Sequence, residues 1–335
     1  MGLPATPRTG SPQDDDSYVL PSAKANSNEQ ERLDAMHEGV TGFLGGRLTF
    51  ADLGNPKRIL EVGAGSGAWA IHAAKDYPDA EVIAIDISPL PERVLPKNLT
   101  FLQMDVCQPL PFDHESFDVV HARFVLMHLP HFRDALARIC ALIKPGGHLV
   151  LEEIDARAYS EHQETPEEVE FFYDRIYDWV ASKDETYDVG SELQPCVSKL
   201  GMFMDVTVKV LVVPFSPGWD GPVEVGALGN TMKQSLLKAS AMLVKVVPGL
   251  MEESVAKFKL AVEEPKHKLR LRVYFLAARK SYKLSQIQNT EVIQKGPLLP
   301  IRVVWRLFGA LLPSHWTGRG LASAASWFIS LLRWR

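Results

Sequence analysis

Three glycines alternate in the stretch ILEVGAGSGAWA (residues 59–70), where Gly63, Gly65 and Gly67 follow an apolar run directly. A glycine turn after a buried strand lets a ligand approach the backbone closely, and one well-known ligand of such turns is the pyrophosphate of a dinucleotide. The spacing of Gly63, Gly65 and Ala68 matches the dinucleotide pattern. The stretch therefore predicts a cofactor-binding loop, and the residues around it must decide which cofactor.

A carboxylate stands two residues before the first of these glycines. Glu61 would face the incoming ligand, where it repels a pyrophosphate and attracts an ammonium or sulfonium group. Its alternative role is that of a partly buried acid that caps the following helix. The sequence also has no Tyr-x-x-x-Lys or similar hydride-transfer pair at a strand end. Both features disfavour an NAD-dependent oxidoreductase, the first alternative function.

Two further acids follow apolar runs. Asp86 ends the run that begins at residue 81, which places it to accept both hydroxyls of a ribose, and Asp105 could accept an adenine amino group. The simpler roles are a helix N-cap for Asp86 and a turn residue for Asp105. With the glycine turn, the two acids describe a pocket for an adenosine linked to a cationic amino acid. The predicted cofactor is S-adenosylmethionine.

Five successive segments resemble the motifs of class I S-adenosylmethionine-dependent methyltransferases, over about residues 28–280. They are EVGAGSG (61–67), Asp86, Asp105, FDVV (117–120) and KPGG (144–147). The resemblance implies an α/β fold with a Rossmann-like sheet of seven strands in the order 3-2-1-4-5-7-6, mostly parallel with the last strand antiparallel. The cofactor-binding residues expected from these motifs and their neighbours are Glu61, Gly63, Gly65, Gly67, Asp86, Ile87, Asp105, Val106 and His121.

A narrower resemblance is to the fungal LaeA-like methyltransferases. It rests on EQERL (29–33), GGRL (45–48), AWAI (68–71), DISP (86–89) and PFSPGW (214–219), and on His37. The family usually has Asp where this chain has Glu61. These enzymes usually belong to secondary metabolism, and the founding member is a nuclear regulator of it. The resemblance implies a small, apolar methyl acceptor, with methylation expected at oxygen. The second alternative is a regulatory protein that acts through partners.

Candidate catalytic groups follow the fourth and fifth apolar runs, because ligands of open α/β sheets lie at the carboxyl ends of strands. A phenol or enol acceptor benefits from a general base, whereas a carboxylate acceptor needs none. We select His121 and His128 as catalytic candidates. His128 lies in an apolar helical stretch, residues 124–129, where a structural histidine is the alternative. The other candidates are Arg123, Glu152, Glu153 and Asp155.

The elements that must position these residues alternate along the chain. Short apolar runs predict strands at 58–62, 81–86, 99–103, 117–121 and 148–153, and helical patterns occupy 28–46, 66–76 and 131–143. Near-continuous apolar strands separated by helices predict a parallel sheet covered on both faces.

After residue 154 the pattern changes. Helices are predicted at 165–182 and 190–200, and a helical insertion at about 222–263. The long apolar runs at 202–213 and 269–279 predict two strands that pair antiparallel. The helical segments would form a substrate cap. Tyr173, Tyr177 and Trp179 of the first helix would roof the substrate or, alternatively, belong to the core.

The chain ends differ from this domain, which we place at 28–283. Residues 1–27 contain little apolar surface and no signal peptide, which predicts disorder. Residues 284–335 form a tail with four of the seven tryptophans and, from residue 292, no acidic residue. This composition suits a helix in a membrane interface; packing on the domain, or a tail without order, are the alternatives.

Composition excludes some functions. A net charge of −5 gives no indication of nucleic-acid binding. The three cysteines are far apart and lack CxxC spacing, which argues against a disulfide framework or a structural zinc, and no metal site is expected. We expect a cytoplasmic protein, with nuclear or membrane association left open by the family resemblance and the tail.

Overall fold

The structure is a computed structural model that describes residues 27–161, 164–183 and 188–282. The expectations for residues 1–27 and 284–335 lie outside the described residues, except that Ser27 begins the first helix.

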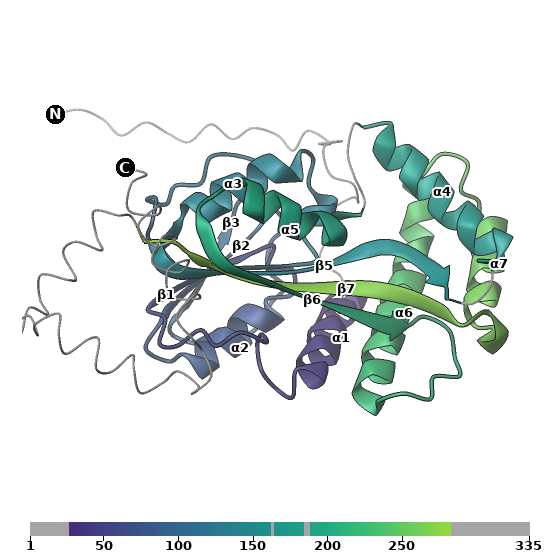
Figure 1. The fold of residues 1–335 in the computed structure, drawn as a ribbon, viewed down its shortest axis with the longest axis horizontal. Coiled ribbons are helices and arrows are strands. Elements are labelled where there is room, and N and C mark those ends of the chain that lie inside the picture. Colours follow the sequence, from purple (N-terminus) through teal and green to yellow (C-terminus); the bar gives the residue numbers. More distant parts are fainter. Residues whose placement is uncertain (1–26, 162–163, 184–187, 283–335) are drawn as a thin grey trace, which may run out of the picture. The chain divides into compact units, whose positions relative to one another are not determined.

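The centre of the fold is a seven-stranded sheet in the order β3-β2-β1-β4-β5-β7-β6 (Figure 1). Pairing is parallel from β3 through β5, and β7 runs antiparallel to both of its neighbours. Both the order and the antiparallel strand are as predicted. The strands are Arg58–Val62 (β1), Glu81–Asp86 (β2), Leu99–Gln103 (β3), Phe117–Arg123 (β4), Ile143–Ser160 (β5), Phe203–Pro214 (β6) and Leu269–Lys280 (β7).

Helices cover both faces of the sheet. In Figure 1, α3 and α5 lie on one side, and α1 and α2 lie on the other. Alternate strand residues face the two layers: Ile59 packs in the core with α2, and its neighbour Leu60 packs in the core with α3. This two-sided burial explains why the central strands read as apolar runs. The helices are Ser27–Phe43 (α1), Ala68–Asp76 (α2), Phe132–Ala141 (α3), Glu167–Ala181 (α4), Val189–Lys199 (α5), Val223–Val246 (α6) and Glu252–Val262 (α7).

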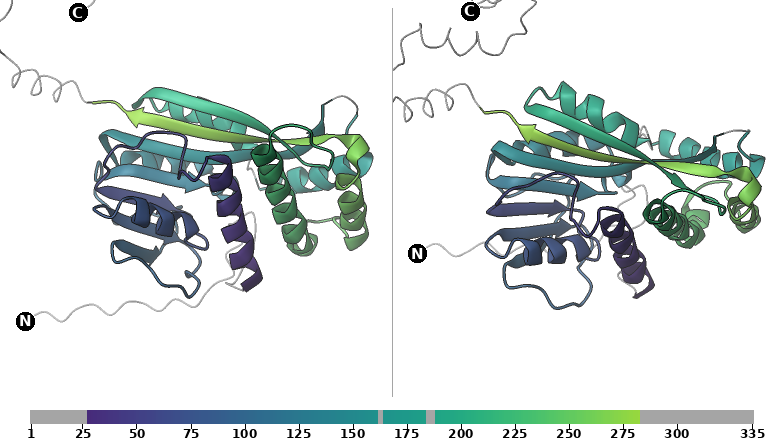
Figure 2. Two further views of the ribbon diagram at one scale, coloured as in Figure 1. Left: turned by 90° about the horizontal axis from the view of Figure 1, so that it is seen from below. Right: turned by 60° about the horizontal axis from the view of Figure 1, so that its bottom comes forward.

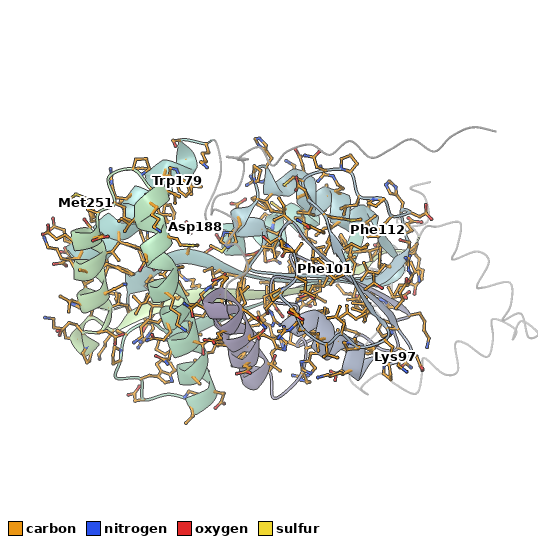
Figure 3. All side chains as sticks on the ribbon, turned by 180° about the vertical axis from the view of Figure 1, so that it is seen from behind. Lys97, Phe101, Phe112, Trp179, Asp188 and Met251 are labelled. Carbon is orange, nitrogen blue, oxygen red and sulfur yellow. The ribbon has the colours of Figure 1, made fainter. Side chains whose placement is uncertain are left out.

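A helical cap lies beyond the end of the sheet, where β5, β6 and β7 extend past the other strands (Figure 2). It contains α4, α6 and α7. The rings of Phe172 and Phe258 stack at 3.8 Å and join α4 to α7, and Tyr173 meets both rings edge-on. Tyr173 is 1% exposed and therefore belongs to the cap core. Trp179 and Met251 mark the cap in Figure 3, and α1 lies between this cap and the part of the sheet marked by Phe101.

Two predicted elements differ from the structure. The fifth strand covers 143–160 where only 148–153 was predicted, because its outer part pairs with β7 across a register shift between Asp155 and Tyr159. The predicted helical stretch 124–129 is a single 3-10 turn, η1 (Leu126–His128). Phe124 precedes this turn with a φ of 54°, a left-handed conformation that no continuous helix contains.

Within the described ranges, no helix is long and apolar enough to cross a membrane.

Helix α6 crosses β6 at a glycine. A Cβ at Gly229 would lie 2.2 Å from the backbone oxygen of Pro214, a contact that neither backbone can relieve without moving. We predict that Gly229→Ala destabilises the fold by about 1–3 kcal/mol, even though alanine is the better helix former. Thermal unfolding followed by circular dichroism measures this.

Gly42 is the matched control, because it is an exposed glycine of α1 with nothing within 4 Å of its Cβ position. Gly42→Ala should stabilise the protein by about 0.5–1 kcal/mol. An unchanged melting temperature for Gly229→Ala would show that α6 does not approach β6 this closely.

Candidate active site

A cavity of about 320 Å³ opens at the carboxyl ends of β1, β2 and β4. Its wall combines the glycine loop after β1, the turn after β2, the residues around η1, and side chains of α1 and α6. Helix α1 lies between α2 and α6 (Figure 2). The cavity is therefore formed by the sheet domain and one helix of the cap together.

The glycine loop needs its glycines for backbone conformation. Gly63, Gly65 and Gly67 all have positive φ, and a Cβ at Gly63 would lie 2.3 Å from a methyl carbon of Val125. The amides of Gly63 and Ala64 donate to the backbone oxygen of Ile85, at 2.8 and 3.0 Å. These N–H groups are bound to β2, so they are unavailable to a pyrophosphate.

Glu61 combines the helix contact considered from the sequence with a position in the cavity wall, and its contact with a ligand stays a prediction. Its carboxylate lines the cavity, is 4% exposed, and accepts the backbone N–H of Ala70 in the first turn of α2. The start of this helix, where a dinucleotide would place its phosphates, therefore already holds a carboxylate. Burial raises the pKa of Glu61 well above its usual value.

Asp86 also lines the cavity and holds the glycine loop. Its Oδ2 accepts the N–H of Gly65 and its Oδ1 the N–H of Ser88, both at 2.8 Å. A carboxylate oxygen accepts more than one hydrogen bond, so both oxygens retain acceptor capacity toward a ligand. Burial raises the pKa of this carboxyl group. The adjacent Ile87 lines the cavity too.

Asp105 lies outside the cavity lining. Its Oδ1 accepts the N–H of Cys107 at 2.8 Å, which is the turn role considered from the sequence. Its neighbours Met104 and Val106 line the cavity instead. Of these two predicted residues, Val106 therefore lines the cavity and Asp105 does not, and the contact of either with the cofactor stays a prediction.

His121 lies beneath the cavity and does not line it. The ring is fully buried and stacks on Trp69 with centroids 3.7 Å apart. It stands between Glu61, 4.0 Å from Nδ1, and Glu152, 3.4 Å from Nε2. Burial lowers the pKa of His121 to about 4. The structure thus places the ring of His121 beneath the floor of the site, outside the cavity lining, and its expected contact with the cofactor or the acceptor stays a prediction.

Arg123, a candidate from the sequence, lines the cavity together with His37, which was not among the candidates. The guanidinium of Arg123 pairs with Glu152 and donates to Nδ1 of His37 at 3.3 Å and to the backbone oxygen of Leu48 at 3.2 Å. Burial and Arg123 lower the pKa of His37 to about 3, so this ring is neutral. His37 belonged to the segments that resemble LaeA-like proteins, which was the available signal.

His128, at the end of η1, brings an imidazole into the cavity wall. Its Nδ1 is buried and has no hydrogen-bond partner among the described residues. Burial, with Arg32 acting in the same direction, lowers the pKa of His128 to about 4, so the ring is neutral at pH 7. Glu153 holds this segment, because its Oε1 accepts the N–H groups of Val125 and Leu126.

Apolar residues of α1, of η1 with its flanks, and of α6 form much of the remaining wall, beside the polar Glu29, Gln30 and Arg32 of α1. The apolar residues include Leu33, Met36, Phe124, Val125, Leu129, Ala239 and Met242. Across the described part of the chain, no group of three or more His, Cys, Asp or Glu side chains could hold a metal ion.

Comparison with known proteins agrees with this site. A family model described as "Methyltransferase domain" matches residues 36–183. The chain is 42% identical over 211 residues to methyltransferase str3 of Strobilurus tenacellus, which covers 63% of this chain and 76% of str3. It is 39% identical over 269 residues to methyltransferase str2 of the same fungus, which covers 79% of this chain and 96% of str2.

A more distant match is the secondary metabolism regulator laeA of Aspergillus flavus, at 32% identity over 140 residues, 41% of this chain and 37% of laeA. The predicted strand order is observed, the cavity lies at the expected edge of the sheet, and the similarity to str2 extends over almost its whole length. The chain belongs to the S-adenosylmethionine-dependent methyltransferases and uses S-adenosylmethionine as its cofactor.

Proposed function

We propose that this methyltransferase acts on an oxygen atom of a small, apolar secondary metabolite. One observation carries the proposal: a single cavity contains Glu61 and Asp86 at one part of its wall and an apolar surface with His128 at another. The first part suits a cationic nucleoside cofactor, and the second suits an apolar acceptor with one polar group. The similarity to a named regulator of secondary metabolism connects the chain with secondary metabolism.

The residues present fit the cofactor. Asp86 would accept the ribose hydroxyls, and the unpartnered, buried Oε2 of Glu61 would meet a positive charge. Met104, Val106 and Ile87 add apolar contacts for an adenine ring. When bound, the sulfonium supplies a methyl group that is displaced by an in-line attack, so the protein must chiefly align the acceptor and exclude water.

His128 would act on the acceptor. A neutral imidazole in the cavity wall can bind a hydroxyl group and accept its proton as the oxygen attacks. Glu153 positions this ring, because its carboxylate accepts hydrogen bonds from the backbone at the start of the same turn.

The cofactor assignment predicts different consequences for two acids. Asp86→Ala should weaken S-adenosylmethionine binding about tenfold to a hundredfold, since hydrogen bonds to a charged group contribute about 1.5–3 kcal/mol. Asp105→Ala should leave the affinity within about threefold, because Asp105 lies outside the cavity lining. Isothermal titration calorimetry measures both. Equal affinities for wild type and Asp86→Ala would contradict the assignment.

The acceptor is identified with extracts of a strain that lacks this gene. We expect the purified protein and methyl-deuterated S-adenosylmethionine to label one small metabolite with a single methyl group, detected by mass spectrometry. Label found in protein and in no small molecule would favour the regulatory alternative.

With that acceptor, His128→Asn should lower kcat by about 10²–10⁴ while cofactor affinity is unchanged, because asparagine binds a hydroxyl but cannot take its proton. His131→Asn is the control. His131 is exposed, begins α3 and lies outside the cavity lining, and its left-handed φ of 48° suits asparagine. Unchanged kcat in His128→Asn would exclude His128 as the base.

A further inference from the structure

Of the carboxyl groups that the structure describes at and beneath the cavity, Glu61 would lack a counter-charge if it were ionised in the free protein. Arg123 is paired with Glu152, and these two groups neutralise each other. Although burial opposes its ionisation, Arg123 and His121 lower the pKa of Glu152 to about 2, so Glu152 is the ionised partner. Asp86 is held by the amides of Gly65 and Ser88. Glu61 has no cation of its own among the described residues.

The groups that face Glu61 come from every neighbouring element. They are Arg123 and His121 on β4, Glu152 on β5, Asp86 at the end of β2, and the Ala70 amide on α2. His121, the nearest imidazole, is neutral at pH 7 because burial lowers its pKa to about 4. The two other carboxylates oppose a negative charge on Glu61, and Arg123 is already engaged by one of them.

The position of Glu61 makes its charge costly. Its side chain is 5% exposed, and Oε2 is buried without a hydrogen-bond partner. A carboxylate moved from water into such a site is neutralised by a proton unless a counter-ion accompanies it. The raised pKa of Glu61 agrees with this arrangement.

We propose that Glu61 selects a positively charged ligand by exchanging its own proton for the charge of that ligand. In the free protein the Glu61 carboxyl group is neutral. When a cationic group reaches Oε2, the O–H bond breaks, the proton leaves to the buffer, and the carboxylate pairs with the cation. The net charge of the buried cluster is the same before and after binding. This inference rests on the proposed cofactor site and adds a proton to its binding equilibrium.

The exchange makes affinity depend on pH. At a pH below the raised pKa of Glu61 in the free protein, the affinity for the cation should rise about tenfold for each unit of pH, since one proton is released. Above that pKa the carboxylate is already ionised, and the affinity becomes independent of this group. A neutral or anionic ligand at this position gains nothing from the exchange.

Calorimetric titration with S-adenosylmethionine at pH 7, in several buffers that differ in ionisation enthalpy, counts the protons. We expect the observed binding enthalpy to change with buffer enthalpy with a slope that corresponds to about one released proton. In Glu61→Gln the slope should fall to near zero. Asp86→Asn is the matched control, a change in a second cavity carboxylate that should weaken binding and keep the slope.

S-adenosylhomocysteine, which has the ammonium group but not the sulfonium, separates two sources of the charge. If a proton is released when either ligand binds, the group that pairs with Glu61 is the ammonium. If a proton is released only when S-adenosylmethionine binds, that group is the sulfonium. Binding with no buffer dependence in wild type, or an undiminished slope in Glu61→Gln, overturns the inference and leaves the cofactor site intact. A failure of S-adenosylmethionine to bind in any buffer instead overturns the cofactor site.

Discussion

The buried ion pair between Arg123 and Glu152 is the interaction on which the site depends. It lies at the carboxyl edge of the sheet, where β4 and β5 run side by side, and its guanidinium reaches two further segments through His37 on α1 and the backbone oxygen of Leu48. Loss of one partner of a buried pair commonly costs about 3–5 kcal/mol, because the other charge is then uncompensated. The same ion pair therefore links the carboxyl ends of β4 and β5 to the segment around Leu48 and to helix α1, which covers the cavity.

From this pair the arrangement extends in two directions. Toward the cofactor end, His121 packs between Glu152 and Glu61 with its ring on Trp69, so the floor under the glycine loop is buried and closely packed. Toward the acceptor end, α1 packs on α6 of the cap, where Arg32 binds Ser235. The long strands β5, β6 and β7 extend beyond the other strands and connect to the cap. Helix α1 packs between the cap and the rest of the sheet domain, and the cavity forms where these two parts both contact α1.

The predicted elements were most accurate where local pattern and burial agree. The first three strands could be read from sequence because each is a short apolar run bounded by polar or turn residues. The extent of β5 could not, since residues 154–160 alternate in burial and become a strand only by pairing with β7. The stretch 124–129 has a helical composition, yet Phe124 is left-handed and Leu129, which precedes Pro130, is extended, so only a single turn forms between them.

The sequence by itself determined the α/β architecture and the cofactor, and it singled out two acids, Glu61 and Asp86, that line the cavity. These follow from the residues next to the strand ends, and strand ends of a parallel sheet meet at one edge whatever the rest of the chain does. Only the tertiary structure decided between residues of the same type. His121 and His128 are both predicted catalytic histidines, but His121 lies within β4, where the pleat buries it under the floor, while the turn after β4 places His128 in the wall. Asp105 was predicted to line the cavity and does not, whereas His37 was not predicted to line it and does. The reason is the same, because contact with the cavity depends on how separate elements pack, and this information is not local to either residue.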